Sequence, residues 1–136
     1  MSLEEIVNVI APELKARGYK KNKLTWHKVK PKLSIVFCIQ KSQYGSDVWY
    51  YLFGINLDDL GPKSKSISTC QIQYGIENTI RNVALSTDSI VHLVDKWESM
   101  YGELGHLKKC AIANSLPEQT SLTAIRYLSS VDISRL

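Results

Sequence analysis

The chain has 136 residues, a hydrophobic share of 44%, a charged share of 22% and a net charge of +4. This length suits one folded domain with its own core, and the composition excludes a disordered, collagenous or membrane-spanning chain. We therefore expect a single domain over residues 1–136. The start MSLEEIVNVI has no basic flank and no long apolar run, which favours a cytoplasmic location without membrane contact.

The first predicted element is a helix that begins near Ser2. Ser2 and Glu5 have the spacing of a capping box, and Gly18 can adopt the left-handed conformation that ends a helix. Pro12 lacks an N–H and clashes with the preceding turn, so it predicts a kink or break near Ile10. The apolar residues recur at helical spacing and give one buried stripe: Leu3, Ile6, Val7, Ile10 and Leu14.

A basic segment, residues 15–32, follows this helix. Its lysines are an alternative nucleic-acid-binding site, because cations of this kind neutralise phosphates: Lys20, Lys21, Lys23, Lys28, Lys30 and Lys32. Nearby aromatic residues would then form a stacking platform for bases: Trp26, Trp49, Tyr50 and Tyr51. We favour the other interpretation, in which the lysines are a solvated rim and the aromatic residues pack in a sheet.

The middle of the chain has the alternating pattern of strands. Leu33, Ile35, Phe37 and Ile39 share one face of the first long run, and the second long run, from 48 to 57, is apolar or aromatic on both faces. The second run is therefore expected in the centre of the sheet. A shorter run, KLTWHKV, precedes them, and SISTCQIQYGI follows with Cys70, Ile72 and Tyr74 facing inward. We expect about four antiparallel strands.

The last third of the chain returns to helical spacing. One helix is expected from the capping residues near 86 to a frayed end at Gly102 and Gly105, and a second is expected to begin at a capping box of Ser115 and Glu118. Its inner face would be Leu122, Ile125 and Leu128. The predicted fold class is α+β, with an antiparallel sheet of about four strands packed against N-terminal and C-terminal helices in a single layer on one face.

Sequence signatures of catalysis, metal binding and cofactor binding are not found. The phosphate loop, the dinucleotide fingerprint, the serine hydrolase elbow and the zincin motif are absent, and the three histidines are too far apart for a local metal pair. We therefore expect no catalytic residues, no metal and no cofactor. The three cysteines have no Cys-x-x-Cys spacing and predict reduced, partly buried thiols. Asp58 and Asp59 are adjacent, which favours a strand-ending turn over a catalytic pair.

Three motifs together resemble a known family. LKARGYKKNKLTWHK, IVFCIQKSQ and YYLFGINL, which lie within residues 14–57, and more loosely Trp97, resemble the bacterial family catalogued as domain of unknown function 4304. This resemblance implies a small α+β protein without assigned enzymatic activity. It implies no catalytic residues for this chain.

Two hypotheses for the function follow from these features. The first is a non-catalytic cytosolic protein-binding module, for example an immunity protein that neutralises a bacterial toxin. Its candidate contacts lie in and after the two long strand runs: Tyr44, Asp47, Tyr50, Asp58 and Asp59. The alternative is a nucleic-acid-binding module that uses the basic segment 15–32. An enzyme is the third and least supported hypothesis.

Overall fold

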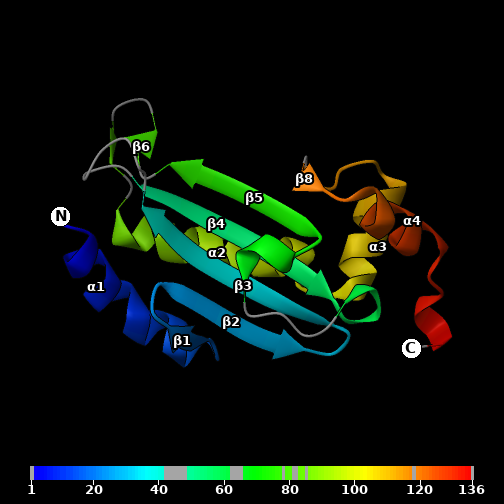
Figure 1. Ribbon diagram of the computed structural model, residues 1–136, viewed down its shortest axis with the longest axis horizontal. Coiled ribbons are helices and arrows are strands. Elements are labelled where there is room, and N and C mark those ends of the chain that lie inside the picture. Colours follow the sequence, from blue (N-terminus) through cyan, green and yellow to red (C-terminus); the bar gives the residue numbers. More distant parts are fainter. Residues whose placement is uncertain are drawn as a thin grey trace.

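The fold is an open antiparallel sheet with helices behind it and at one end, as a computed structural model shows (Figure 1). The structure describes residues 2–41, 49–61, 66–77, 79–80, 83–84, 86–117 and 119–135. The helices are α1 (Leu3–Ala16), α2 (Thr87–Tyr101), α3 (Leu104–Ile112) and α4 (Leu122–Ser130), with short 3-10 turns η1 (Asp58–Leu60), η2 (Ile67–Thr69) and η3 (Ile133–Arg135). The strands are β1 (Lys20–Asn22), β2 (Thr25–Lys30), β3 (Leu33–Lys41), β4 (Trp49–Leu57), β5 (Ile72–Glu77), β6 (Thr79–Ile80), β7 (Val83–Ala84) and β8 (Gln119–Thr120).

The main sheet has the order β1-β2-β3-β4-β5-β8, and every pairing in it is antiparallel. The α+β class is therefore confirmed, and β4 is central, as its two apolar faces indicated. The expected number of about four strands is too low, because this sheet has six and β6 and β7 pair separately. The extra members β1 and β8 have three and two residues, which is too short to show an alternating pattern.

The core lies on the face of the sheet that α1 and α2 cover. Leu33, Ile35, Phe37 and Ile39 of β3 are all at most 2% exposed, and the matching residues of β4 are buried with them, as predicted: Trp49, Tyr51, Phe53, Ile55 and Leu57. Ile6, Ile10 and Leu14 of α1 belong to the same cluster. The alternation in the sequence thus identified the core face correctly.

Helix α1 begins and ends where its signals placed it, but it does not break. The Ser2 hydroxyl accepts a hydrogen bond from the Glu5 N–H at 3.2 Å, and Gly18 has the left-handed φ of 91°. Of the kink or break predicted near Ile10, the break is wrong, because the helix is continuous through Pro12 from Leu3 to Ala16. Packing of its three buried residues offsets the hydrogen bond that proline removes.

The C-terminal helices differ from the expectation in two ways. A separate helix, α3, follows α2, and α4 begins after Ser121, whose side chain accepts from the Ala124 N–H, not after Ser115. The inner face of α4 is Ala124 and Leu128, while Leu122 is 60% and Ile125 is 38% exposed. Start positions shift in this way because several residues of one segment can cap a helix. Within the described ranges, no helix combines the length and the apolar character needed to cross a membrane.

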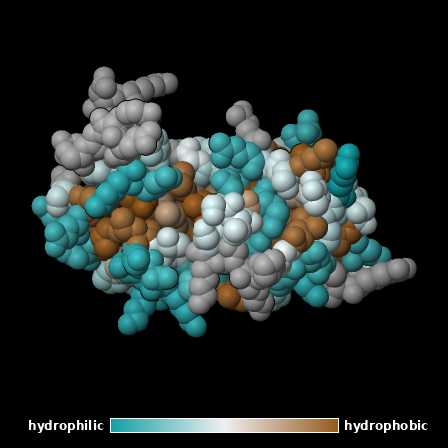
Figure 2. Space-filling model, in the orientation of Figure 1, coloured by the Kyte–Doolittle hydropathy of each residue, from teal (hydrophilic) through white to brown (hydrophobic). Residues whose placement is uncertain are grey.

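The opposite face of the sheet is partly covered by η2. A Cβ on Gly54 would lie 2.5 Å from Cδ1 of Ile67, so only glycine allows η2 to approach β4 this closely. Beyond η2, apolar residues gather on this face over the sheet (Figure 2), where Cys38 and Leu52 face each other as cross-strand partners and are half-buried.

Candidate functional site

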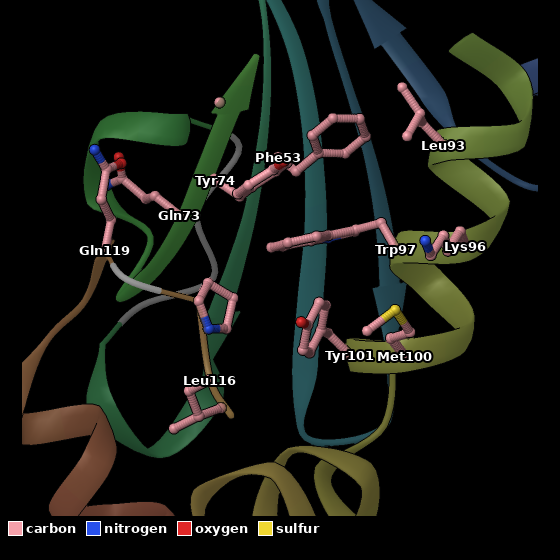
Figure 3. A pocket seen from close by; sticks show the side chains of 12 residues that line it. Phe53, Gln73, Tyr74, Leu93, Lys96, Trp97, Met100, Tyr101, Leu116 and Gln119 are labelled. Atoms are coloured by element: carbon pink, nitrogen blue, oxygen red, sulfur yellow. The ribbon is translucent and has the colours of Figure 1, made fainter. Parts of the chain in front are cut away.

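A cavity of about 480 Å³ lies between α2, the edge of the sheet at β5 and the segment before β8 (Figure 3). It is on the same side of the sheet as α2, at the end of the core. Its lining residues are mostly apolar or aromatic: Phe53, Gln73, Tyr74, Gly75, Leu93, Lys96, Trp97, Met100, Tyr101, Leu116, Pro117 and Gln119. The size and this apolar lining with few polar groups are those of ligand-binding and peptide-binding sites.

The wall formed by α2 follows from helical spacing. Leu93, Trp97 and Met100 recur every three or four residues, so their side chains lie along one face of the helix. The side chain of Ser86 begins the helix by accepting a hydrogen bond from the Ser89 N–H at 3.1 Å. The same helix is held to the other end of the sheet by Glu98, which accepts from Lys28 at 3.0 Å and from the Tyr19 hydroxyl at 3.0 Å. The α2 wall is therefore anchored independently of the cavity.

The aromatic residues of the cavity form a connected series. The ring centroids of Tyr74 and Trp97 are 6.1 Å apart, and the two ring planes are nearly parallel. The ring centroids of Trp97 and Tyr101 are 4.8 Å apart, and these ring planes are tilted against each other. On the core side, the ring centroid of Phe53 lies 5.4 Å from that of Trp97. Trp97 is 6% exposed, while Tyr74 is 46% and Met100 is 43% exposed. An apolar surface is thus presented at the mouth of the cavity, over a rigid aromatic base.

Strand β5 has few described backbone partners next to the cavity. Strand β8 pairs with Ile72 and Gln73 alone, and the Gln71 carbonyl accepts from the Ser121 N–H at 2.8 Å. Since the residues of an antiparallel strand alternate in the side to which their N–H and C=O point, Gln73 and Gly75 face the same edge as Gln71. Among the described residues, Gly75 has no partner on that edge.

One charged side chain, the exposed Lys96, lies among the described residues of the cavity wall. Burial raises the pKa of the Tyr101 hydroxyl, which therefore stays neutral and can donate a hydrogen bond at physiological pH. The cavity thus combines an apolar base with one cation and neutral polar groups. This arrangement can bind an apolar side chain next to an acidic group.

The predicted protein contacts do not converge on this cavity. Tyr44 and Asp47 lie outside the described residues. Tyr50 is half-buried on the opposite face of the sheet, where it pairs with Gln40. Asp58 and Asp59 form the turn η1, as expected, and Asp59 accepts from the Tyr127 hydroxyl at 2.6 Å. Asp58 has one buried carboxylate oxygen without a hydrogen-bond partner in the described part of the chain.

The six lysines of the alternative site lie on both faces of the sheet. Lys21 lies 5.7 Å over the Trp26 ring and Lys28 binds Glu98, both on the helix side, and Lys30 shares their face by alternation. Lys20 pairs with His27 on the other face, and Lys23 and Lys32 occupy turns with positive φ. The proposed stacking platform is largely buried, since Trp26, Trp49 and Tyr51 are at most 6% exposed.

The cysteines and histidines form no cluster. Cys38, Cys70 and Cys110 are all free, and burial raises the pKa of the Cys70 thiol to about 12. In the described ranges, no group of three potential metal ligands comes together.

The cavity residues were visible in the sequence only as packing residues. Tyr74 was expected to face inward, and it does lie on the core side, where its ring stacks on that of Trp97. The sequence does not show that β5 lies near the edge of the sheet, so the exposure of Tyr74 was missed. Lys96 and Met100 were missed for the same reason, because only the position of α2 beside that edge makes them cavity residues.

Comparisons with known proteins give one match. The model of the family described as Domain of unknown function (DUF4304) matches residues 10–100, which include β1 to β7 and most of α2. Leu116, Pro117 and Gln119, which line the cavity, lie outside the match. No curated protein and no solved structure matches the chain significantly.

Proposed function

This chain belongs to the DUF4304 family of domains of unknown function, and we propose that it is a non-catalytic protein-binding module whose contact site is the cavity beside β5. The observation that carries this proposal is the mouth of the cavity. At this mouth, the side chain of Tyr74 is 46% exposed and that of Met100 is 43% exposed, and both lie over a base of packed aromatic residues. Exposed aromatic residues and methionine next to a hollow are typical of protein contact sites.

The charges of the chain suit an acidic partner surface. The net charge is +4, and Lys96 stands at the cavity. An immunity protein that neutralises a bacterial toxin is the finer form of this proposal. A toxin with an acidic face fits these charges better than a nuclease, whose nucleic-acid-binding surface is basic. A cytoplasmic location belongs to the same proposal, and three free thiols suit a reducing compartment.

The test is site-specific photo-crosslinking in the source cells. A benzophenone amino acid replaces Met100 at the cavity mouth, and a control chain carries it at Val29, which is 55% exposed on the other face of the sheet. We expect one protein to be cross-linked from position 100 and not from position 29. That protein, once purified, should bind the chain, and Met100→Glu should weaken the complex. Labelling that is equal at both positions, or absent at position 100, would overturn the proposal.

Nucleic-acid binding through residues 15–32 stays the alternative. Four of its lysines are exposed, in β1 and in the turns at the two ends of β2: Lys20, Lys21, Lys23 and Lys32. If they bind phosphates, affinity should fall steeply with salt, and the double variant Lys20→Glu with Lys21→Glu should abolish it. Binding that is absent at low salt would remove this alternative.

A further inference from the structure

We infer that the cavity between α2 and β5 binds a free small molecule that carries a planar aromatic ring and a carboxylate. The inference goes beyond the proposed function, which concerns a protein at the mouth of this cavity and does not require a ligand below it. The occupant at the base of the cavity is a small aromatic carboxylate and not a residue of the partner protein.

The cavity has the size and the depth of a small-molecule site. Its volume is about 480 Å³, within the range of roughly 300–1,000 Å³ that such sites have. The exposed fraction falls from 46% for Tyr74 and 43% for Met100 at the mouth to 6% for Trp97 at the base. A molecule that reaches the base leaves most of its contact with water behind, and this favours the binding of an apolar ring.

Two facing walls of the cavity are held in place without a ligand. On one side, Glu98 of α2 accepts hydrogen bonds from Lys28 and Tyr19, which fixes the helix to the sheet. On the other side, Gln119 pairs with β5, and the Pro117 carbonyl accepts from the hydroxyl of Thr120 in β8 at 2.6 Å. A preformed site of this kind loses little binding free energy to reorganisation.

The base of the cavity favours a planar aromatic ring. The ring centroids of Tyr74 and Trp97 are 6.1 Å apart, and the ring of Trp97 extends from α2 toward Tyr74 (Figure 3). Tyr101 adds a third ring, tilted against that of Trp97. Aromatic rings attract one another in offset-stacked and edge-to-face arrangements, and rings at these different angles offer both to a bound ring. An aliphatic ligand of the same size would be buried without gaining these contacts.

Two groups at the cavity can bind a carboxylate. Lys96 lines the cavity and has no ion pair among the described residues. The Tyr101 hydroxyl points across the cavity toward the segment that carries Leu116 (Figure 3), and it has no hydrogen-bond partner in the described part of the chain. An ammonium group and a phenol hydroxyl can both donate a hydrogen bond to a carboxylate. The described lining residues include no carboxylate that would compete for these donors.

The test uses phenylacetate as the probe and follows its binding to the isotope-labelled full chain by NMR. The three indole N–H signals, of Trp26, Trp49 and Trp97, serve as reporters, because only Trp97 lines the cavity. We expect the Trp97 signal alone to move, with a Kd of about 5 mM or tighter for a ligand of this size. Phenylacetamide has the same shape without the charge, and cyclohexylacetate has the charge without the aromatic ring. Both should bind about fivefold more weakly.

Variants of the chain identify the groups that bind the carboxylate. Lys96→Met removes the charge but keeps the length of the side chain, and it should weaken phenylacetate about fivefold without affecting phenylacetamide. Lys109→Met, at an exposed lysine of α3, is the matched control and should bind normally. Tyr101→Phe removes only the hydroxyl and should weaken phenylacetate about threefold. Urea denaturation checks that each variant is folded.

Four results would overturn the inference: no movement of the Trp97 signal, equal movement of all three tryptophan signals, equal binding of phenylacetate and either analogue, or an unchanged affinity in Lys96→Met. Each of them would leave the proposed function in place, because a partner cross-linked from position 100 does not need a ligand. Conversely, phenylacetate binding at Trp97 without any cross-linked partner would support the ligand site and count against the proposed function.

Discussion

Two aromatic clusters on the same face of one sheet behave differently. The closed aromatic cluster is Trp26, Phe37, Tyr51 and Phe53, each at most 2% exposed, and the open aromatic cluster is Tyr74, Trp97 and Tyr101. The two clusters meet at Phe53 and Trp97, whose ring centroids are 5.4 Å apart. The residue types are alike, so chemistry does not separate the clusters.

The difference comes from the neighbouring strands. Phe37 and Phe53 lie on strands with a partner strand on each side, whereas Tyr74 lies on β5, whose described pairs with β8 are those of Ile72 and Gln73. A strand side chain is covered by its cross-strand neighbours as well as by the helix above it. The comparison therefore teaches that the position of an aromatic residue in the sheet, and not its type, sets how much of it is exposed, and it leads to four predictions.

The largest effect is expected in the closed aromatic cluster. Phe37→Ala should lower the free energy of unfolding by about 3–5 kcal/mol, because Phe37 is fully buried and contacts three other rings. Urea denaturation measures this loss, and Phe37→Leu, which retains most of the volume, should lose less. A loss for Phe37→Ala as small as that of an exposed residue would show that this cluster is not the core.

The next effect tests the anchor that holds α2 over both clusters. Glu98→Ala removes the acceptor for Lys28 and Tyr19 and should cost about 1.5–3 kcal/mol, since the lysine side chain is 24% exposed and would lose its charged partner. Asp95→Ala on the same helix is the control. Its carboxylate is 51% exposed and binds Arg17, so about 0–1 kcal/mol is expected. Equal losses in urea denaturation would contradict this ranking.

A smaller effect on stability is expected in the open aromatic cluster. Tyr74→Ala should cost about 1 kcal/mol, the worth of its ring contacts, because nearly half of the side chain is already exposed. Binding of the protein partner proposed for the cavity should nevertheless fall about tenfold or more. Comparing the unfolding and binding curves of this variant with those of Phe37→Leu separates the two clusters. A Tyr74→Ala chain that binds normally would break the comparison.

The smallest effect concerns Tyr127, which lies outside both clusters. Burial and then the hydrogen bond to Asp59 raise the pKa of Tyr127 from 10.0 to about 12. Because the folded pKa is the higher one, this stabilisation is complete below pH 10 and is lost as the pH rises toward 12. Asp59→Asn should lower the pKa, which phenolate absorbance measures against a Tyr127→Phe blank. An unchanged titration would show that Asp59 does not contribute.

Much of the fold could be predicted from local patterns. The alternation in β3 and β4 identified the core face and the central strand, and Ser2 and Gly18 marked the ends of α1. The α+β class follows from these elements. Local patterns were less reliable where several residues compete, as at the start of α4, and they were silent for strands as short as β8.

The sequence by itself determined which residues are apolar, in which period they recur and which segments can form strands or helices. Only the tertiary structure decided that β8 pairs with β5 at Ile72 and Gln73, and that Met100 and Lys96 line the same cavity as Tyr74. The physical reason is that alternation and helical spacing act between near neighbours in the chain. The cavity depends instead on contacts between residues 53, 74, 97 and 117, which only the folded sheet brings together.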